Sequence, residues 1–150
     1  MLISTQDDRS PVINQSRDAK LSITSLQGHR VLIAEDEPII ALDLATAFES
    51  VGAEAIIVHT LRDAIAVARI DALTAAVVDI FLKNELSSPL CALLQLRDIP
   101  FVVYTGSDDT DFKYRSLIIA KPAPAELIVD RLGILAQYQV AKTTRPSSPT

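Results

Sequence analysis

The sequence predicts an α/β fold in which helices cover both faces of a five-stranded parallel sheet. Short apolar runs of strand length alternate with segments of helical pattern, which is the signature of βαβ units around a parallel sheet. Residues 31–34 and 75–78 are two such runs, and each is followed directly by an acidic residue. Apolar runs without polar alternation suit strands that are buried on both faces, so these two runs belong near the centre of the sheet.

The strands and helices follow one another in a regular order. The expected strands cover residues 30–34, 54–59, 74–79, 100–104 and 117–120. The expected helices cover residues 38–51, 61–70, 88–97 and 123–138. A proline in the first turn and a glycine just past the end delimit the first helix, which begins at Pro38 and precedes Gly52. Thr60 is placed to cap the second helix.

Apolar spacing predicts which side of a helix faces the core. In the first helix the inward residues are expected to be Ile39, Leu42, Ala45 and Phe48. In the last helix they are expected to be Leu127, Leu132 and Leu135. Between residues 105 and 117 the sequence is polar and rich in residues that favour caps and turns. A loop or a single turn is therefore expected there, in place of a full helix.

Composition and hydropathy predict one domain between two polar tails. A chain of 150 residues, of which 49% are hydrophobic, can bury a substantial core. We expect a polar, flexible N-terminal tail over residues 1–27, one domain over residues 28–140 and a disordered C-terminal tail over residues 141–150. A short strand or helix within residues 20–26 is left open, since Leu21, Ile23 and Leu26 are apolar enough to touch the domain.

Charge and cysteine content exclude several classes of protein. The net charge of −5 argues against direct binding to nucleic acid, which requires concentrated positive charge. The single cysteine, Cys91, excludes an intramolecular disulfide. No segment has the pattern of a signal peptide or a membrane span, so we expect a cytoplasmic protein that does not contact a membrane.

Polar residues that can carry out chemistry follow four of the five expected strands. They are Glu35 and Asp36 after the first strand, Asp79 at the end of the third, Thr105 after the fourth and Lys121 after the fifth. The carboxyl ends of parallel strands share one edge of a sheet, so these side chains are expected to converge there. Clustered carboxylates suit Mg²⁺, and an aspartate can act as a nucleophile toward phosphorus. A hydroxyl and an ammonium can hold phosphoryl oxygens, so the set favours phosphoryl transfer.

Each of these residues also has an ordinary structural explanation when it is taken alone. Acids just before a helix favour its N-terminus, and a threonine followed by a glycine can simply form a turn. Their joint occurrence, in this order and at these strand ends, is what favours a shared site. His29 and His59 lie outside the set, and we assign them no role.

This set, with Pro122 after Lys121, resembles the receiver domain of two-component response regulators over about residues 30–139. The resemblance implies a flavodoxin-like, doubly wound sheet with strand order 2-1-3-4-5. It also implies that Asp79 is the phosphoacceptor, that Lys121 pairs with its carboxylate and that Thr105 moves toward the phosphoryl group on activation. Finally, it implies a Mg²⁺ ion held by Glu35, Asp36, Asp79 and the backbone carbonyl of Phe81.

The chain departs from the commonest receiver pattern at three positions. Glu35 stands where aspartate is more frequent, Ile118 where an aromatic residue usually precedes the lysine by three, and Ala123 where phenylalanine often follows the proline. Residues 100–107 resemble the Pro-Phe-x-Phe-Ala-Thr-Gly-Tyr segment of certain stand-alone receivers, found mainly in alphaproteobacteria, which often have a reduced fourth helix. Tyr104 is a candidate to take over part of the work of the missing aromatic residue.

The resemblance implies a single-domain response regulator. It would accept a phosphoryl group on Asp79 from a histidine kinase or a histidine phosphotransfer protein, and then either signal to a downstream protein partner or act as a phosphate sink in a phosphorelay. We do not expect an enzyme beyond catalysis of its own phosphoryl transfer and dephosphorylation, and a homodimer through the last helix is left open. The alternative is a pseudo-receiver that binds partners independently of phosphorylation. A phosphatase of the haloacid dehalogenase type would need a second acid where Phe81 stands.

Overall fold

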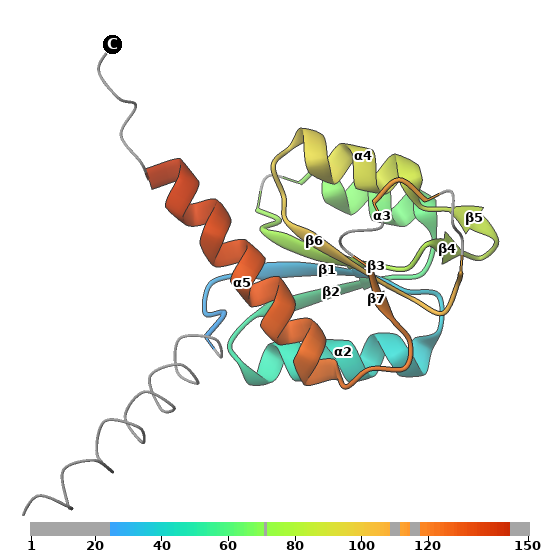
Figure 1. Ribbon diagram of the computed structural model, residues 1–150, viewed down its shortest axis with the longest axis horizontal. Coiled ribbons are helices and arrows are strands. Elements are labelled where there is room, and N and C mark those ends of the chain that lie inside the picture. Colours follow the sequence, from blue (N-terminus) through green and yellow to red (C-terminus); the bar gives the residue numbers. More distant parts are fainter. Residues whose placement is uncertain (1–24, 71, 109–111, 115–117, 145–150) are drawn as a thin grey trace, which may run out of the picture.

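The computed structural model describes residues 25–70, 72–108, 112–114 and 118–144. Its five-stranded parallel sheet has the spatial order β2 (Glu54–Val58), β1 (Arg30–Ala34), β3 (Ala75–Val78), β6 (Phe101–Thr105) and β7 (Ile118–Ala120) (Figure 1). This order confirms the expected 2-1-3-4-5 arrangement. Each predicted strand end agrees with the structure to within one residue, and Leu117, the predicted start of the fifth strand, lies outside the described residues.

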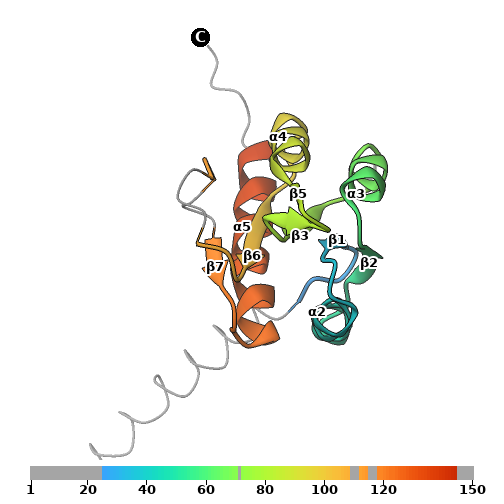
Figure 2. The same cartoon turned by 90° about the vertical axis from the view of Figure 1, so that its right-hand side faces the viewer.

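Helices cover both faces of the sheet, as expected (Figures 1 and 2). One face packs against α2 (Pro38–Ser50) and α5 (Ala125–Thr144), and the other against α3 (Leu61–Ala68) and α4 (Ser88–Leu96). Side chains of β1 alternate between the two apolar layers, because Val31 and Ile33 join one buried cluster and Leu32 joins the other. All four residues of β3 are buried, so solvent is excluded from both faces of the sheet at its centre.

Between β6 and β7 the structure describes residues 106–108 and 112–114. Lys113 and Tyr114 form a turn, and none of the described residues between these strands is helical. This agrees with the prediction of a loop or single turn. A groove of about 540 Å³ lies beside the turn, lined in part by Tyr114, by Asp98 before β6 and by Tyr138 of α5.

A two-stranded hairpin between β3 and α4 was not predicted. Its strands, β4 (Phe81–Leu82) and β5 (Glu85–Leu86), pair antiparallel across a two-residue turn. Lys83 and Asn84 form that turn with φ angles of 48° and 67°, the left-handed region that a tight hairpin requires. The usual glycine signal is missing from this turn, and each strand has only two residues, so the apolar pattern carried little information.

The inward face of α2 differs from the prediction at two positions. Ile39 and Leu42 are 85% and 64% exposed, so their assignment to the core was wrong. The buried residues are Ala41, Leu44, Ala45 and Phe48. These follow the i, i+3, i+4, i+7 spacing of one helix face, whereas a repeated spacing of three drifts around the helix.

The bounds of α5 also differ from the prediction of a helix over residues 123–138. Pro122 and Pro124 restrict the backbone and lack an amide hydrogen, so the helix begins at Ala125. It continues to Thr144 because residues 139–144 include no glycine or proline. Residues 141–144, which were expected in the disordered C-terminal tail, are therefore helical, and residues 145–150 lie outside the described part.

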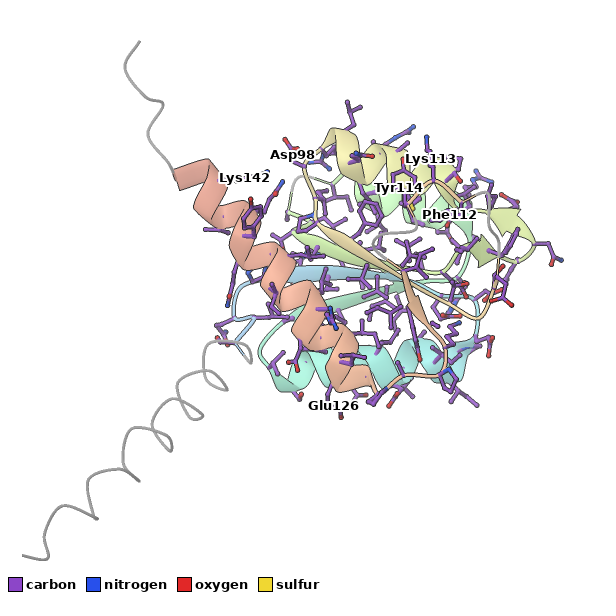
Figure 3. The ribbon with its side chains drawn as sticks, viewed as in Figure 1. Asp98, Phe112, Lys113, Tyr114, Glu126 and Lys142 are labelled. Atoms are coloured by element: carbon purple, nitrogen blue, oxygen red, sulfur yellow. The ribbon has the colours of Figure 1, made fainter. Side chains whose placement is uncertain are left out.

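The core face of α5 was only partly predicted. Leu132 is buried and Leu135 packs partly buried against the core, but Leu127 is 37% exposed, which contradicts its predicted inward position. The buried line of this helix consists of Ala125, Ile128, Val129, Leu132 and Ala136. Glu126 in the first turn and Lys142 in the last complement the helix dipole (Figure 3).

The domain begins before residue 28. Leu26, within the expected N-terminal tail, is 2% exposed, and its N–H donates to the carbonyl of Val51 at 2.9 Å. Residues 1–24 lie outside the described part. None of the helices in the described ranges is long and apolar enough to cross a membrane.

Phe48 and Ile39 test which face of α2 holds the fold together. Phe48→Ala removes a fully buried ring and should destabilise the domain by about 3–5 kcal/mol, measured by urea unfolding. Ile39→Ala on the same helix is the matched control, and its exposed side chain should change the free energy of unfolding by no more than about 0.5 kcal/mol. Equal losses in the two variants would contradict this helix orientation.

Candidate functional site

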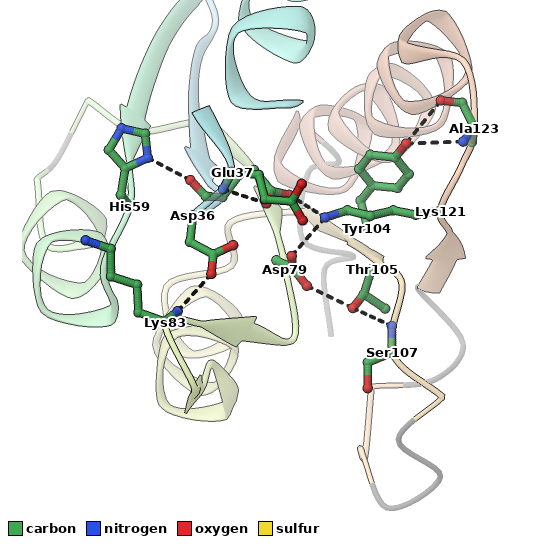
Figure 4. A network of polar contacts seen from close by, with 11 residues as sticks. Asp36, Glu37, His59, Asp79, Lys83, Tyr104, Thr105, Ser107, Lys121 and Ala123 are labelled. Atoms are coloured by element: carbon green, nitrogen blue, oxygen red, sulfur yellow. Dashed lines mark hydrogen bonds and ion pairs between the residues drawn. The ribbon is translucent and has the colours of Figure 1, made fainter. Parts of the chain in front are cut away.

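The strand ends that carry the predicted site residues meet at one edge of the sheet. Parallel pairing sets the end of β3 between β1 and β6, and β7 lies next to β6. Glu35, Asp79, Thr105 and Lys121 form one connected network of hydrogen bonds and ion pairs at this edge (Figure 4). The sheet order thus brings together residues that lie up to 86 positions apart in the sequence.

Asp79 is the centre of this network. Thr105 donates from Oγ1 to Asp79 Oδ1 at 2.8 Å, and Lys121 donates from Nζ to Asp79 Oδ2 at 2.9 Å. The N–H of Asp79 donates to the carbonyl of Ala34 at 3.0 Å, which extends the β1–β3 pairing by one residue. With Asp79 only 9% exposed, its carboxylate is fixed in orientation at the rim of the sheet.

Lys121 links two carboxylates. Its Nζ also donates to Glu35 Oε2 at 2.8 Å, so one ammonium bridges Glu35 and Asp79. Burial lowers the pKa of Lys121, but the hydrogen bonds to Glu35 and Asp79 outweigh it, and the pKa is raised above its ordinary value. The amine therefore remains a cation at neutral pH.

Glu35 is more deeply buried, at 2% exposure. Burial is the main reason that its pKa is raised from 4.5 to about 7, and the negative charge of Asp79 raises it further. The hydrogen bonds from Lys121 and from the Glu37 N–H, at 3.2 Å from Glu35 Oε1, act in the opposite direction. Near neutral pH this carboxylate is therefore poised between its charged and neutral forms.

Asp36 completes the acidic cluster from the other side. The N–H of Lys83 donates to Asp36 Oδ2 at 3.0 Å, so the unexpected hairpin holds this side chain in place. One carboxylate oxygen from each of Glu35, Asp36 and Asp79 lies within 4.8 Å of the others.

Mg²⁺ fits this donor set. Three carboxylates face a single ammonium, and a hard divalent cation with oxygen ligands relieves the remaining repulsion. Phe81 follows Asp79 by two residues and pairs with Leu86 in the hairpin. The next rung carries the bond from the Ser87 N–H to the Ile80 carbonyl, so Phe81 occupies a non-hydrogen-bonded position and its carbonyl is not used by the hairpin.

His59 contacts the site, although sequence reasoning gave it no role. Its Nδ1 lies 2.9 Å from the backbone carbonyl of Glu35 (Figure 4). Val58 pairs with Ala34 in the β1–β2 register, so the next residues along, His59 and Glu35, come side by side. The strand register would have identified His59, but a sequence without a sheet order does not supply it. His29 instead contacts Thr74 Oγ1, at 3.0 Å, away from this edge.

Comparisons with known proteins support the fold. No protein-family model matches the chain, and no curated protein matches it. The response regulator PhyR from Brucella abortus is similar, with a TM-score of 0.74, 20% identity and coverage of 89% of this chain and 58% of that chain. A CheY-like receiver domain from Methanospirillum hungatei has a TM-score of 0.69 and 20% identity, and covers 76% of this chain and 98% of that chain.

The receiver domain of HemR from Leptospira biflexa is also similar, with a TM-score of 0.65, 21% identity and coverage of 79% of this chain and 98% of that chain. At such identities a structural likeness shows the fold alone. The chain therefore has the fold of response regulator receiver domains, and it spans 58% of the length of the PhyR chain. Its activity has to be argued from the site.

The raised pKa of Glu35 predicts a pH-dependent affinity for Mg²⁺. In the metal-free protein Glu35 takes up a proton as the pH falls through about 7, and that proton competes with the cation. The Mg²⁺ dissociation constant measured by calorimetry should therefore be larger at about pH 6 than at about pH 8. Glu35→Gln cannot titrate and should bind Mg²⁺ more weakly, with little change across this range. A dissociation constant that is the same in the parent at both pH values would contradict the prediction.

Proposed function

We propose that the chain is a response regulator receiver domain that accepts a phosphoryl group on Asp79. The observation that carries the proposal is the fixed carboxylate of Asp79, which is held by Thr105 and Lys121 beside two further carboxylates. A structural ion pair would need only one acid and one base. The additional acids and the hydroxyl are what phosphoryl transfer uses.

The proposed reaction uses these groups in two steps. A carboxylate oxygen of Asp79 attacks the phosphorus of a phosphohistidine, the P–N bond breaks, and its electron pair returns to the imidazole of the donor. The product on this chain is an acyl phosphate. Lys121 and Thr105 lie within hydrogen-bonding distance of the Asp79 carboxylate and would follow the charge onto the phosphoryl oxygens.

Mg²⁺, held by Glu35, Asp36, Asp79 and the Phe81 carbonyl, would neutralise charge on the phosphoryl oxygens. In a second step, dephosphorylation, water attacks the phosphorus, the bond between phosphorus and the Asp79 oxygen breaks, and inorganic phosphate leaves. Catalysis would be limited to these two steps, so the chain would act as a signalling domain.

The donor would be a histidine kinase or a histidine phosphotransfer protein. The phosphorylated form would either bind a downstream protein or drain phosphoryl groups from a branched relay. We place the chain in the stand-alone subgroup with the Pro-Phe-x-Phe-Ala-Thr-Gly-Tyr segment. Residues 100–107 resemble that segment, and none of the described residues between β6 and β7 is helical, which supports this placement.

Intact-mass measurement tests the proposal. Incubation with Mg²⁺ and acetyl phosphate should add the mass of one phosphoryl group to the parent protein and none to Asp79→Asn, which lacks the nucleophilic oxygen. Asp43→Asn, an exposed aspartate on α2, is the matched control and should be phosphorylated like the parent. Chelation of Mg²⁺ should slow the reaction strongly. An unmodified parent would favour the alternative, a pseudo-receiver that binds partners without phosphorylation.

A further inference from the structure

Tyr104 makes an unusual pair of contacts for a residue of a buried strand. It is 6% exposed and belongs to the apolar layer between the sheet, α2 and α5. Its Oη donates to the carbonyl of Ala123 at 3.1 Å and accepts from the N–H of the same residue at 3.2 Å (Figure 4). One phenol therefore satisfies both backbone groups of Ala123, in the short segment between β7 and α5.

Tyr104 is also linked to the site. It precedes Thr105 in β6, and Lys121 Nζ lies 5.4 Å from the centroid of the Tyr104 ring, within the range of a cation–π contact. The N–H of Lys121 donates to the carbonyl of Thr105 at 2.9 Å. Residues 121–123 are thus tied to the end of β6 at three points, and two of these points are the ring and the hydroxyl of Tyr104.

Side chains alternate between the two faces of β6, so its last two residues point to opposite sides of the sheet. Thr105 directs its hydroxyl to Asp79, whereas Tyr104 points to the layer of α2 and α5. Ile118, at the position where receivers usually carry an aromatic residue, is only partly buried, packs in the opposite apolar layer and has no polar group for such a contact. Tyr104 is therefore the aromatic side chain that bridges the site and the segment leading into α5.

We propose that Tyr104 is a positioning residue that transmits the state of Asp79 to residues 121–125 and the first turn of α5. This inference rests on the proposed phosphorylation of Asp79. When that carboxylate carries a phosphoryl group, the Thr105 hydroxyl and the Lys121 ammonium turn from its oxygens to the phosphoryl oxygens. Lys121 then shifts over the ring of Tyr104, and the ring is fixed at its far end to Ala123.

The consequence is a defined output surface. Pro122 and Pro124 are exposed on either side of Ala123, so a change at this segment alters a surface that a protein partner can contact. On this account the signal leaves the site on the side of α5.

Tyr104→Phe tests this inference, because it keeps the ring over Lys121 and removes both hydrogen bonds to Ala123. Amide hydrogen exchange is measured by mass spectrometry over residues 119–128, with and without Mg²⁺ and acetyl phosphate, and intact mass is recorded on the same samples. Tyr114→Phe is the matched control, since Tyr114 packs edge-on against Phe101, at 5.7 Å between ring centroids, in the other apolar layer.

The quantity compared is the difference in amide exchange between each protein with and without Mg²⁺ and acetyl phosphate. The parent and Tyr114→Phe should show a donor-dependent change of exchange in this segment, and Tyr104→Phe should become phosphorylated yet lose most of that change. If Tyr104 only stabilised this segment, Tyr104→Phe would raise amide exchange both with and without the donor and leave the donor-dependent difference intact. That result would overturn the inference. An unphosphorylated parent would instead contradict the proposed function, and the inference with it. Tyr104→Leu, which also removes the ring from Lys121, should lose the difference at least as completely.

Discussion

The bridge that Lys121 forms between Glu35 and Asp79 is the interaction on which the site depends. Two largely buried carboxylates next to each other are costly, and one ammonium within 2.9 Å of both makes their burial tolerable. This requirement constrains the fold, because the three residues come from the ends of β1, β3 and β7. Only a sheet that places those strand ends at one edge can satisfy it. The compensation is also incomplete, since Asp36 adds a third acid, and this remaining negative charge is what makes the cluster suitable for a divalent cation.

The architecture supplies this geometry with few specialised parts. Two apolar layers bury the central strands on both faces, so the positions of the strand ends are set by the same packing that stabilises the domain. Contacts with nearby residues then orient the side chains of the site. The β4–β5 hairpin presents the Lys83 N–H to Asp36, His59 contacts the Glu35 carbonyl, and Tyr104 fixes Ala123 two residues past Lys121. The proposed phosphoryl transfer uses five side chains, and these neighbouring contacts fix their positions.

Features that depend on one dominant physical cause could be predicted from the sequence, and features that depend on several competing causes could not. Continuous apolar runs followed by acids predicted β1 and β3, and parallel strands oblige their ends to share an edge, so the clustering of Glu35, Asp79, Thr105 and Lys121 could be expected. The inward side of α2 was misassigned because Ile39 and Leu42 extend a repeated spacing of three from Ala45 and Phe48, and that spacing drifts around the helix away from the buried face. The hairpin was missed because Lys83 and Asn84 adopt left-handed backbone angles without the help of a glycine. The contact of His59 depends on the β1–β2 register, which exists only once the strands pair.

Chemical localisation of the phosphoryl group tests the central claim most directly. Borohydride reduces an acyl phosphate of aspartate to homoserine, so protein treated with Mg²⁺ and acetyl phosphate can be reduced, digested and sequenced by mass spectrometry. The account predicts homoserine at position 79 and unmodified aspartate at position 36, with no conversion when the donor is omitted and much less when Mg²⁺ is omitted. Homoserine at another acidic position, or aspartate recovered intact at position 79, would contradict the assignment of Asp79 as the nucleophile of this site.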